Sequence, residues 1–341
     1  MPVARHFLAS LLISLAGIAS AQQAAQPPSK EDLERCARIA NPEARLACFD
    51  ELVPAPPNPP EEMIVPEPED EPSLLGDRWG IGISDRDSRF DLKPHKASYL
   101  LVARYSNAPN TLPTSPTKQP LAEPLNIDRT EAKFQLSFKV KVADFEQIID
   151  GIPPAALWVG YTQQSQWQVY NPQVSRPFRE TNYEPEVMFA FFPDQKALGW
   201  RWRLFALGLN HQSNGQSDPL SRSWNRVYLL FGIEQEHVGL LIRPWVRLNE
   251  PYNKDDNPDI THYLGYGDIT AVYSAGEHTL SAIGRYNPAS GKGALQAAWN
   301  FPLQRRVHGY VQLFTGYGES LIDYNWRQTT IGIGLSLGDA L

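Results

Sequence analysis

From about residue 73 onward, apolar and polar residues alternate in segments of roughly ten, and turn residues separate the segments. A period of two is the pattern of a β-strand whose two faces meet different surroundings. The alternating segments occupy residues 95–105, 133–143, 155–169, 184–193, 200–213, 222–235, 237–248, 262–274, 277–287, 293–302, 307–318 and 329–337. An even number of such segments suits a closed single-chain barrel. The chain is therefore predicted to be all-β, with a twelve-stranded antiparallel transmembrane β-barrel over residues 73–341.

The hydropathy of the chain allows this architecture. No run of 18 or more apolar residues follows the N-terminus, so a helical membrane protein is disfavoured. Mean hydropathy is −0.38, which a barrel tolerates because only every second strand residue faces lipid. A formal net charge of −7 argues against a nucleic-acid binder. A soluble all-β protein with aromatic residues in its core is the alternative explanation of the same pattern.

The connections between segments alternate between short and long. Tight turns are predicted at 234–237, 274–277 and 303–306. Long polar connectors are predicted at 106–131, 170–183, 214–221, 249–261, 288–292 and 319–328. Short periplasmic turns and long extracellular loops produce such an alternation. Aromatic residues near the segment ends are predicted to form interfacial girdles, namely Trp158, Trp167, Tyr170, Trp200, Trp202, Trp224, Tyr228, Trp245, Tyr263, Tyr317 and Trp326.

The first 21 residues have the organisation of a secretory signal peptide. Arg5 and His6 precede an apolar run over residues 7–18, and Ala19-Ser20-Ala21 supplies a small-x-small cleavage site. The apolar run is too short for a membrane anchor. Export with a signal of this style indicates the bacterial envelope, with the following N-terminal extension in the periplasm.

Residues 22–52 are predicted to contain two short helices that meet near Asn41-Pro42 and are clasped by a Cys36–Cys48 disulfide. A disulfide is the default expectation in an exported protein. Residues 53–72 are dense in proline and acidic residues, which predicts an extended linker. The role of this extension is open between binding a periplasmic partner or the cell wall and spacing the barrel from its export signal.

Residues 211–225 carry a candidate catalytic group. His211 and Ser213 lie two residues apart, so a strand places them on one face together with Phe205, Leu207 and Leu209. After a polar turn, the next strand begins near Asn225, and a hairpin would bring Asn225 to the same place. A serine hydroxyl needs a base, usually histidine, and an asparagine oxygen can hold that histidine in the right tautomer. The alternative is a polar strand end that runs into a Ser/Asn/Gly turn.

The order of the strands predicts where the candidate catalytic group lies in the membrane. If the chain enters the barrel from the periplasm, the fifth strand reaches the outer side at residues 211–213, on the lipid-facing wall. An acyl-transfer site at that depth would meet the ester bonds of membrane lipids.

The segment 211–225 resembles the active-site segment of the bacterial outer-membrane phospholipase A family. Residues 161–163, 177–185, 255–261 and 316–325 also resemble segments of that family, in the same order. The resemblance extends over most of residues 75–341 and implies a calcium-dependent lipase that acts on phospholipids and lysophospholipids. It implies that Ser213 is the nucleophile, His211 the base and Asn225 the orienting residue.

The resemblance also implies residues for calcium and for assembly. Family members are active as homodimers, and Gln163 matches a polar residue of the dimer interface. Calcium ligands are implied at Ser221 through its hydroxyl, at Gln216 through its backbone carbonyl, and at Ser175 contributed by a second subunit; a second calcium position is implied at Asp218 and Asp256.

Two other functions are compatible with a predicted outer-membrane barrel. A non-enzymatic outer-membrane barrel, either a pore or a structural protein, would show no lipase activity and an open lumen. A membrane-embedded protease would need acidic and histidine residues converging in the barrel mouth, and the sequence shows no such set.

Overall fold

The computed structural model describes residues 29–52, 73–81, 89–145, 153–173, 178–304 and 307–337. The chain divides into two compact units, Met1–Glu69 and Asp70–Leu341. The predicted signal peptide at 1–21 and the acidic linker at 53–72 lie outside the described residues and remain predictions. None of the helices in these described ranges is both long enough and apolar enough to cross a bilayer.

The N-terminal unit contains two helices, α1 (Lys30–Ala37) and α2 (Pro42–Leu52). A disulfide joins Cys36 to Cys48, with Cα atoms 5.5 Å apart, which confirms the predicted bridge. Asn41 caps α2, because its side-chain oxygen accepts a hydrogen bond from the Glu43 N–H at 2.9 Å. A short covalent link suits a pair of helices that is too small to bury much apolar surface.

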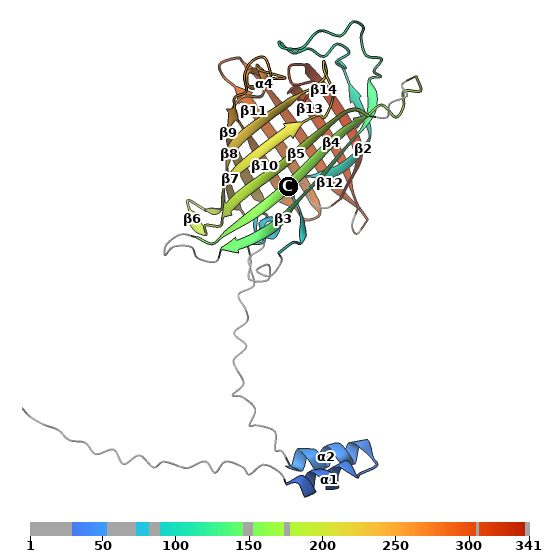
Figure 1. Cartoon of the computed structure of the whole chain (residues 1–341), viewed down its shortest axis with the longest axis vertical. Helices are drawn as coiled ribbons and strands as arrows, with labels where there is room; N and C mark the ends of the chain where they lie inside the picture. The colour runs from blue at the N-terminus through green and yellow to red at the C-terminus, as the bar shows by residue number, and fades with distance from the viewer. Residues whose placement is uncertain are drawn as a thin grey trace, which may run out of the picture. The chain divides into compact units, whose positions relative to one another are not determined.

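The second unit is a closed barrel of twelve long antiparallel strands (Figure 1), as the alternation predicts. These are β2 (Ser98–Ser106), β3 (Thr130–Phe145), β4 (Ala155–Trp167), β5 (Phe178–Phe191), β7 (Trp200–Ser213), β8 (Ser223–Gln235), β9 (Val238–Leu248), β10 (Gly267–Ala275), β11 (His278–Asn287), β12 (Lys292–Gln304), β13 (Val307–Tyr317) and β14 (Arg327–Leu337). The barrel closes because β2 pairs with both β3 and β14. Two short strands, β1 (Leu92–Pro94) and β6 (Gln195–Ala197), pair with β3 and β7.

The two ends of the barrel differ in their connections. The segments 107–129, 168–173, 214–222, 249–266, 288–291 and 318–326 lie at one end, called the long-loop end below. The turns at 236–237 and 276–277 belong to the opposite, short-turn end. The predicted alternation of short and long connections is therefore present. The residues in the triad segment lie at the long-loop end.

One predicted strand starts too early. The segment 262–274 was expected to be a strand throughout, but α4 (Ile260–Leu264) occupies its beginning and β10 starts at Gly267. Gly265, with φ of 71°, ends the helix and turns the chain into the strand. Apolar residues at the start of this segment thus serve a helical turn, since a short apolar run does not distinguish the two structures.

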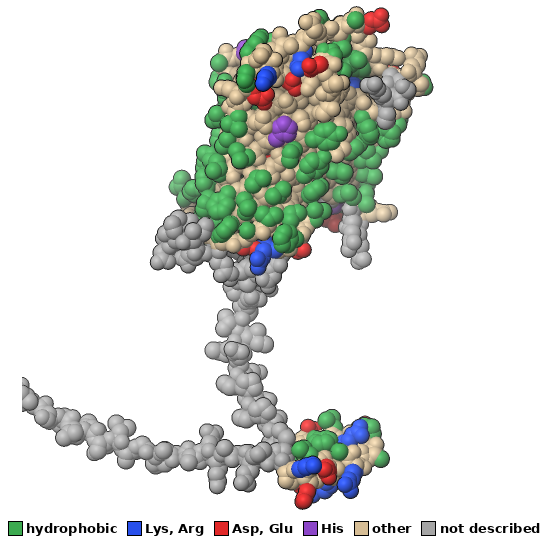
Figure 2. Space-filling model, in the orientation of Figure 1, with side chains coloured by type: hydrophobic (Ala, Val, Ile, Leu, Met, Phe, Trp, Pro, Cys, Tyr) green, Lys and Arg blue, Asp and Glu red, His purple; other side chains and the backbone are tan. Residues whose placement is uncertain are grey.

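The barrel has an apolar outside and a polar inside. On β7, Leu207 and Leu209 are 48% and 56% exposed, whereas the neighbouring Asn210 is buried. Figure 2 shows hydrophobic side chains in a broad band over the wall, and charged side chains gathered towards its two ends. An outward apolar band is what a lipid environment requires of a barrel.

Part of the predicted aromatic girdle is wrong. Trp158, Trp224 and Trp245 are buried inside the barrel, because each lies at an inward position of its strand. Trp224 donates its indole hydrogen to the Gln212 side chain at 2.9 Å. Trp202 is 40% exposed and does face outward. Aromatic residues near strand ends therefore serve both faces.

A short plug lies inside the barrel. It comprises residues 73–81 with α3 (Gly76–Trp79), and the Leu75 N–H donates to a Glu234 carboxylate oxygen at 2.9 Å. Trp79 packs edge-on against Trp158, with ring centroids 5.9 Å apart. The ammonium of Lys139 lies 3.2 Å from the centre of the Trp79 ring, in a cation–π contact.

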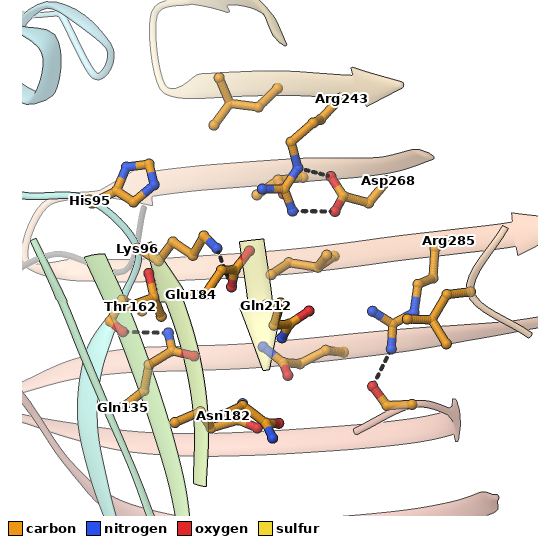
Figure 3. A pocket seen from close by; sticks show the side chains of 18 of the residues that line it. His95, Lys96, Gln135, Thr162, Asn182, Glu184, Gln212, Arg243, Asp268 and Arg285 are labelled. Atoms are coloured by element: carbon orange, nitrogen blue, oxygen red, sulfur yellow. Dashed lines mark hydrogen bonds and ion pairs between the residues drawn. The ribbon is translucent and has the colours of Figure 1, made fainter. Parts of the chain in front are cut away.

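The rest of the lumen is crossed by paired charges. Lys96 Nζ lies 2.8 Å from a Glu184 carboxylate oxygen, and Arg243 lies 2.6 Å from Asp268 (Figure 3). These side chains line a cavity of about 250 Å³. Paired charges stiffen the wall that carries the candidate site, because breaking a buried pair is costly.

Candidate active site

The β7–β8 hairpin brings His211 and Asn225 into contact. The two residues lie opposite each other in the strand register. His211 Nδ1 and Asn225 Oδ1 are 2.8 Å apart, the distance of a hydrogen bond in which the imidazole donates. His211 is exposed on the outward face, and Asn225 is half-buried. The pairing predicted from the hairpin pattern is thus present.

Ser213 lies two residues beyond His211 on the same outward face of β7. Its side chain is half-buried at the end of the strand. Within the described residues, no hydrogen bond joins the Ser213 hydroxyl to His211. Nucleophile–base contacts often tighten only when a substrate is bound, so proximity on one face is the relevant feature.

A row of outward residues crosses four strands at this level. Register pairs join Gln163 to Tyr183, Tyr183 to Ser213, and Ser213 to Ser223. Gln163 was ambiguous from sequence, because a lumen-facing glutamine is common. Its neighbours Thr162 and Gln164 line the internal cavity, so strand alternation directs Gln163 outward. The Gln163 side chain bonds within this outer face, to Tyr161 and Ser165.

The connection after Ser213 is held by Asn214. Its side chain donates to the Leu220 carbonyl at 2.8 Å and accepts from the Arg222 N–H at 2.9 Å. Gly215 follows with φ of 63°, a conformation that favours glycine. Gln216 donates its side-chain amide to Glu180 at 2.6 Å. These bonds give the chain just after the nucleophile candidate a defined course.

The residues implied for calcium lie in two neighbouring connections. Ser221 donates its hydroxyl to a carboxylate oxygen of Asp256 at 2.6 Å. A hydroxyl that donates its proton keeps its lone pairs for a cation, so Ser221 fits a calcium ligand. Gln216 lies in the same 214–222 connection. Ser175 lies outside the described residues.

The second implied calcium position already holds a positive charge. The ammonium of Lys118, from the 107–129 connection, lies 2.5 Å from Asp218 and 2.6 Å from Asp256. Burial would lower the pKa of Lys118, but its hydrogen bonds to the two carboxylates outweigh burial and raise that pKa. Burial would likewise raise the pKa of Asp256, but the hydrogen bonds from Lys118 and Ser221 lower it. The carboxylates of Asp218 and Asp256 therefore enclose the ammonium of Lys118 instead of open space.

Two residues of the site were missed from the sequence. Lys118 reaches the site from a different connection, and no local pattern marked it. Glu250 accepts a hydrogen bond from the Asn225 side-chain amide at 3.1 Å. Glu250 could have been predicted from the strand pattern. It lies two residues after Leu248, which is the register partner of Asn225, and residues two apart share a face of a strand.

Comparisons with known proteins agree with this geometry. The phospholipase A1 family model matches residues 75–337. A putative phospholipase A1 of Neisseria meningitidis serogroup B is 44% identical over 270 residues, which cover 76% of this chain and 69% of that protein. Phospholipase A1 of Escherichia coli K12 is 38% identical over 282 residues, covering 82% of this chain and 92% of that protein. A crystal structure of the Salmonella typhi outer membrane phospholipase dimer with bound calcium has a TM-score of 0.66 at 39% identity, covering 74% of this chain and 94% of that one.

Proposed function

The chain belongs to the phospholipase A1 family, and from that premise we propose that it hydrolyses acyl esters of glycerophospholipids and lysophospholipids at the outer leaflet, with Ser213 as nucleophile. It is an outer-membrane phospholipase by its relationship to proteins of that name and fold. We further propose specific roles for Ser213, His211 and Asn225, for a bound calcium ion and for a second copy of the chain. The N-terminal extension is proposed to lie in the periplasm.

The contact between His211 and Asn225 is the main support for the proposed catalytic group. His211 Nδ1 lies 2.8 Å from Asn225 Oδ1, on the outward face that also bears Ser213. When Nδ1 carries the proton and donates it to Asn225, Nε2 is left as the base. An outward site at the border of the apolar band suits a substrate whose ester lies just below its headgroup.

The reaction then follows from these three side chains. Ser213 Oγ bonds to the ester carbonyl carbon while its proton passes to His211 Nε2. His211 returns that proton to the oxygen of the departing glycerol fragment, and Ser213 is left acylated. A water molecule then gives a proton to His211 and attacks the acyl carbon. The fatty acid leaves, and the proton returns to Ser213 Oγ.

The backbone beside Ser213 supports stabilisation of the oxyanion. In the described part of the chain, the Gly215 N–H has no hydrogen-bond acceptor. A backbone N–H held in place near the reacting carbon stabilises developing negative charge. The positive φ of Gly215 turns the chain there, and an added Cβ would lie 3.2 Å from the Tyr183 ring.

Calcium is proposed as the cofactor. Ser221 through its hydroxyl and Gln216 through its carbonyl would hold it, because both are hard oxygen donors in the connection that follows Ser213. When bound there, the ion would supply positive charge close to the developing oxyanion. Ser175 is proposed as a donor from a second copy.

The outward position of Gln163 supports a homodimer. A glutamine amide that faces lipid is costly, and a second copy would bury it in a protein interface. Gln163 and Ser213 share one row of the outer wall. An interface centred on Gln163 would therefore border both active sites.

The rival pore function finds less support in the lumen. Arg104 binds Glu131 at 2.7 Å and also contacts Glu319, while Lys133 lies 3.2 Å from Glu319. These buried side chains cross the lumen near the long-loop end. A conducting pore would need them to separate.

The direct test compares Ser213→Ala with Ser217→Ala, an exposed serine of the same connection. Fatty-acid release from phospholipid in detergent micelles would be measured with calcium and with a chelator. Ser213→Ala should lower the rate by at least about a thousandfold, while the change in gel mobility on heating shows that the barrel is folded. Ser217→Ala should leave the rate unchanged. Hydrolysis retained by Ser213→Ala would refute the assignment.

A further inference from the structure

Glu250 is placed beside the proposed triad by the end of β9. Asn225 of β8 pairs in register with Leu248 of β9, which is 46% exposed on the outer face. Glu250 lies two residues further along and continues on that face. It also precedes Pro251, and the residue before a proline is held in an extended conformation. The half-buried Glu250 carboxylate thereby meets Asn225.

The segment that follows Glu250 is anchored at several points. Arg247 binds both carboxylate oxygens of Asp255 at 2.6 Å. The side-chain oxygen of Asn257 accepts from the Ser223 N–H at 3.0 Å. The 249–266 connection is therefore fixed to β9 at Asp255 and to β8 at Asn257, and Glu250 lies between these anchors and the end of β9, so its carboxylate has little freedom to move away.

The hydrogen bond between Asn225 and Glu250 fixes which way the Asn225 amide points. The Asn225 side-chain NH2 donates to a Glu250 carboxylate oxygen at 3.1 Å, and its oxygen lies 2.8 Å from His211 Nδ1. An asparagine amide can turn either its oxygen or its NH2 towards a neighbour. A carboxylate only accepts hydrogen bonds, so Glu250 selects the orientation in which the NH2 faces it and the oxygen faces His211.

We propose that Glu250 is a positioning residue, the fourth member of a Ser213–His211–Asn225–Glu250 chain, which fixes the Asn225 amide and through it the tautomer of His211. This inference rests on the proposed triad. An aspartate in the third position would present oxygen on both sides and would need no such partner. An asparagine needs one, because the reversed amide would direct a donor at His211 Nδ1 and favour the wrong tautomer. Glu250 also places negative charge on the side of the chain away from the forming imidazolium.

The test is a pair of substitutions in two backgrounds. Glu250→Leu removes the acceptor and should lower kcat by about ten- to a hundredfold, with KM little changed. Glu250→Gln keeps an amide oxygen that can accept from Asn225 and should cost only a few-fold. Glu123→Leu, which removes an exposed carboxylate from another connection at the same end, should leave kcat unchanged.

The second background is Asn225→Asp. There Glu250 faces another carboxylate, so Glu250→Leu should no longer lower the rate and should raise it. A purely structural role of Glu250 would lower the rate in both backgrounds. The wild type, Glu250→Leu, Asn225→Asp and the double variant would also be compared by the rate at which a long-chain sulfonyl fluoride labels Ser213. That rate reports on the activated nucleophile even when turnover is slow.

The outcomes separate the two proposals. If Ser213→Ala still hydrolyses lipid and still labels, the triad itself is wrong. If Ser213→Ala is inactive but Glu250→Leu keeps full activity, or if Glu250→Leu is equally harmful in both backgrounds, only the positioning role of Glu250 is overturned.

Discussion

The ammonium of Lys118 lies 2.6 Å from a carboxylate oxygen of Asp256 and ties the 107–129 connection to the 249–266 connection beside the active site. The neighbouring Thr117 hydroxyl donates to the Asp255 carbonyl at 2.5 Å and joins the same two segments. Lys118 thus provides the positive charge that balances Asp218 and Asp256. Without Lys118, a bound cation would be needed to balance these two carboxylates.

Lys118→Met should create a calcium site at Asp218 and Asp256. With the ammonium removed, Asp218 and Asp256 repel each other, and hard oxygen ligands attract calcium. We expect the variant to bind one more calcium ion per chain than the wild type by isothermal titration. At a calcium concentration a hundred times the new Kd, the ion should stabilise the variant by about 2.7 kcal/mol. Lys254→Met, at an exposed lysine of the 249–266 connection that also carries Asp256, is the control. Equal calcium binding by wild type and Lys118→Met would contradict the prediction.

Gln163→Leu should weaken dimerisation and leave the monomer intact. The substitution removes an amide from the outer wall, where hydrogen bonds between subunits contribute about 0.6–2 kcal/mol each. The dimer dissociation constant in detergent, measured by analytical ultracentrifugation with calcium, should rise by about three- to thirtyfold. Thr329→Val, on the outer face of β14, should have no effect. A dimer unaffected by Gln163→Leu would place the interface elsewhere.

Glu319→Gln should destabilise the barrel. Glu319 is buried between Arg104 and Lys133, and its loss leaves buried positive charge without a full counter-charge. Breaking a buried pair from one side costs about 3–5 kcal/mol. The free energy of unfolding, measured by denaturant titration in lipid vesicles, should fall by roughly that amount. Glu277→Gln in an exposed turn should change it by less than about 0.5 kcal/mol; a similar small change for Glu319→Gln would count against the network.

The short-turn end offers a test by pH. The hydrogen bond from Arg201, at 2.6 Å, is the main cause that lowers the pKa of Asp194 to about 2. A lowered pKa contributes stability that is complete above the usual value near 4 and is lost as pH falls through about 2. Asp194 is half-exposed, so Asp194→Asn should cost less than about 1 kcal/mol at neutral pH. The difference from wild type should shrink between pH 4 and pH 2; a difference independent of pH would exclude the ion pair as its source.

Much of the fold was predictable because side-chain direction along a strand is a local property. Successive residues point to opposite faces, so the alternation in β7 identifies the strand, its outward residues and the shared face of His211 and Ser213. The turn after Ser213 predicts the hairpin that places Asn225 opposite His211. The apolar start of the 262–274 segment misled for a related reason, since a few residues carry too little pattern to separate a helical turn from a strand.

By itself, the sequence therefore determined the barrel, the paired cysteines, the candidate triad and its outward face. Only the tertiary structure decided that Trp158 and Trp224 face inward, that Gln163 faces outward, and that Glu250 and Lys118 complete the surroundings of the site. Glu250 and Lys118 lie in connections whose conformations have no period of two, and closure of the barrel sets which residues these connections meet. The contact of Lys118 with Asp256 spans two such connections, and no local pattern in either one specifies its partner.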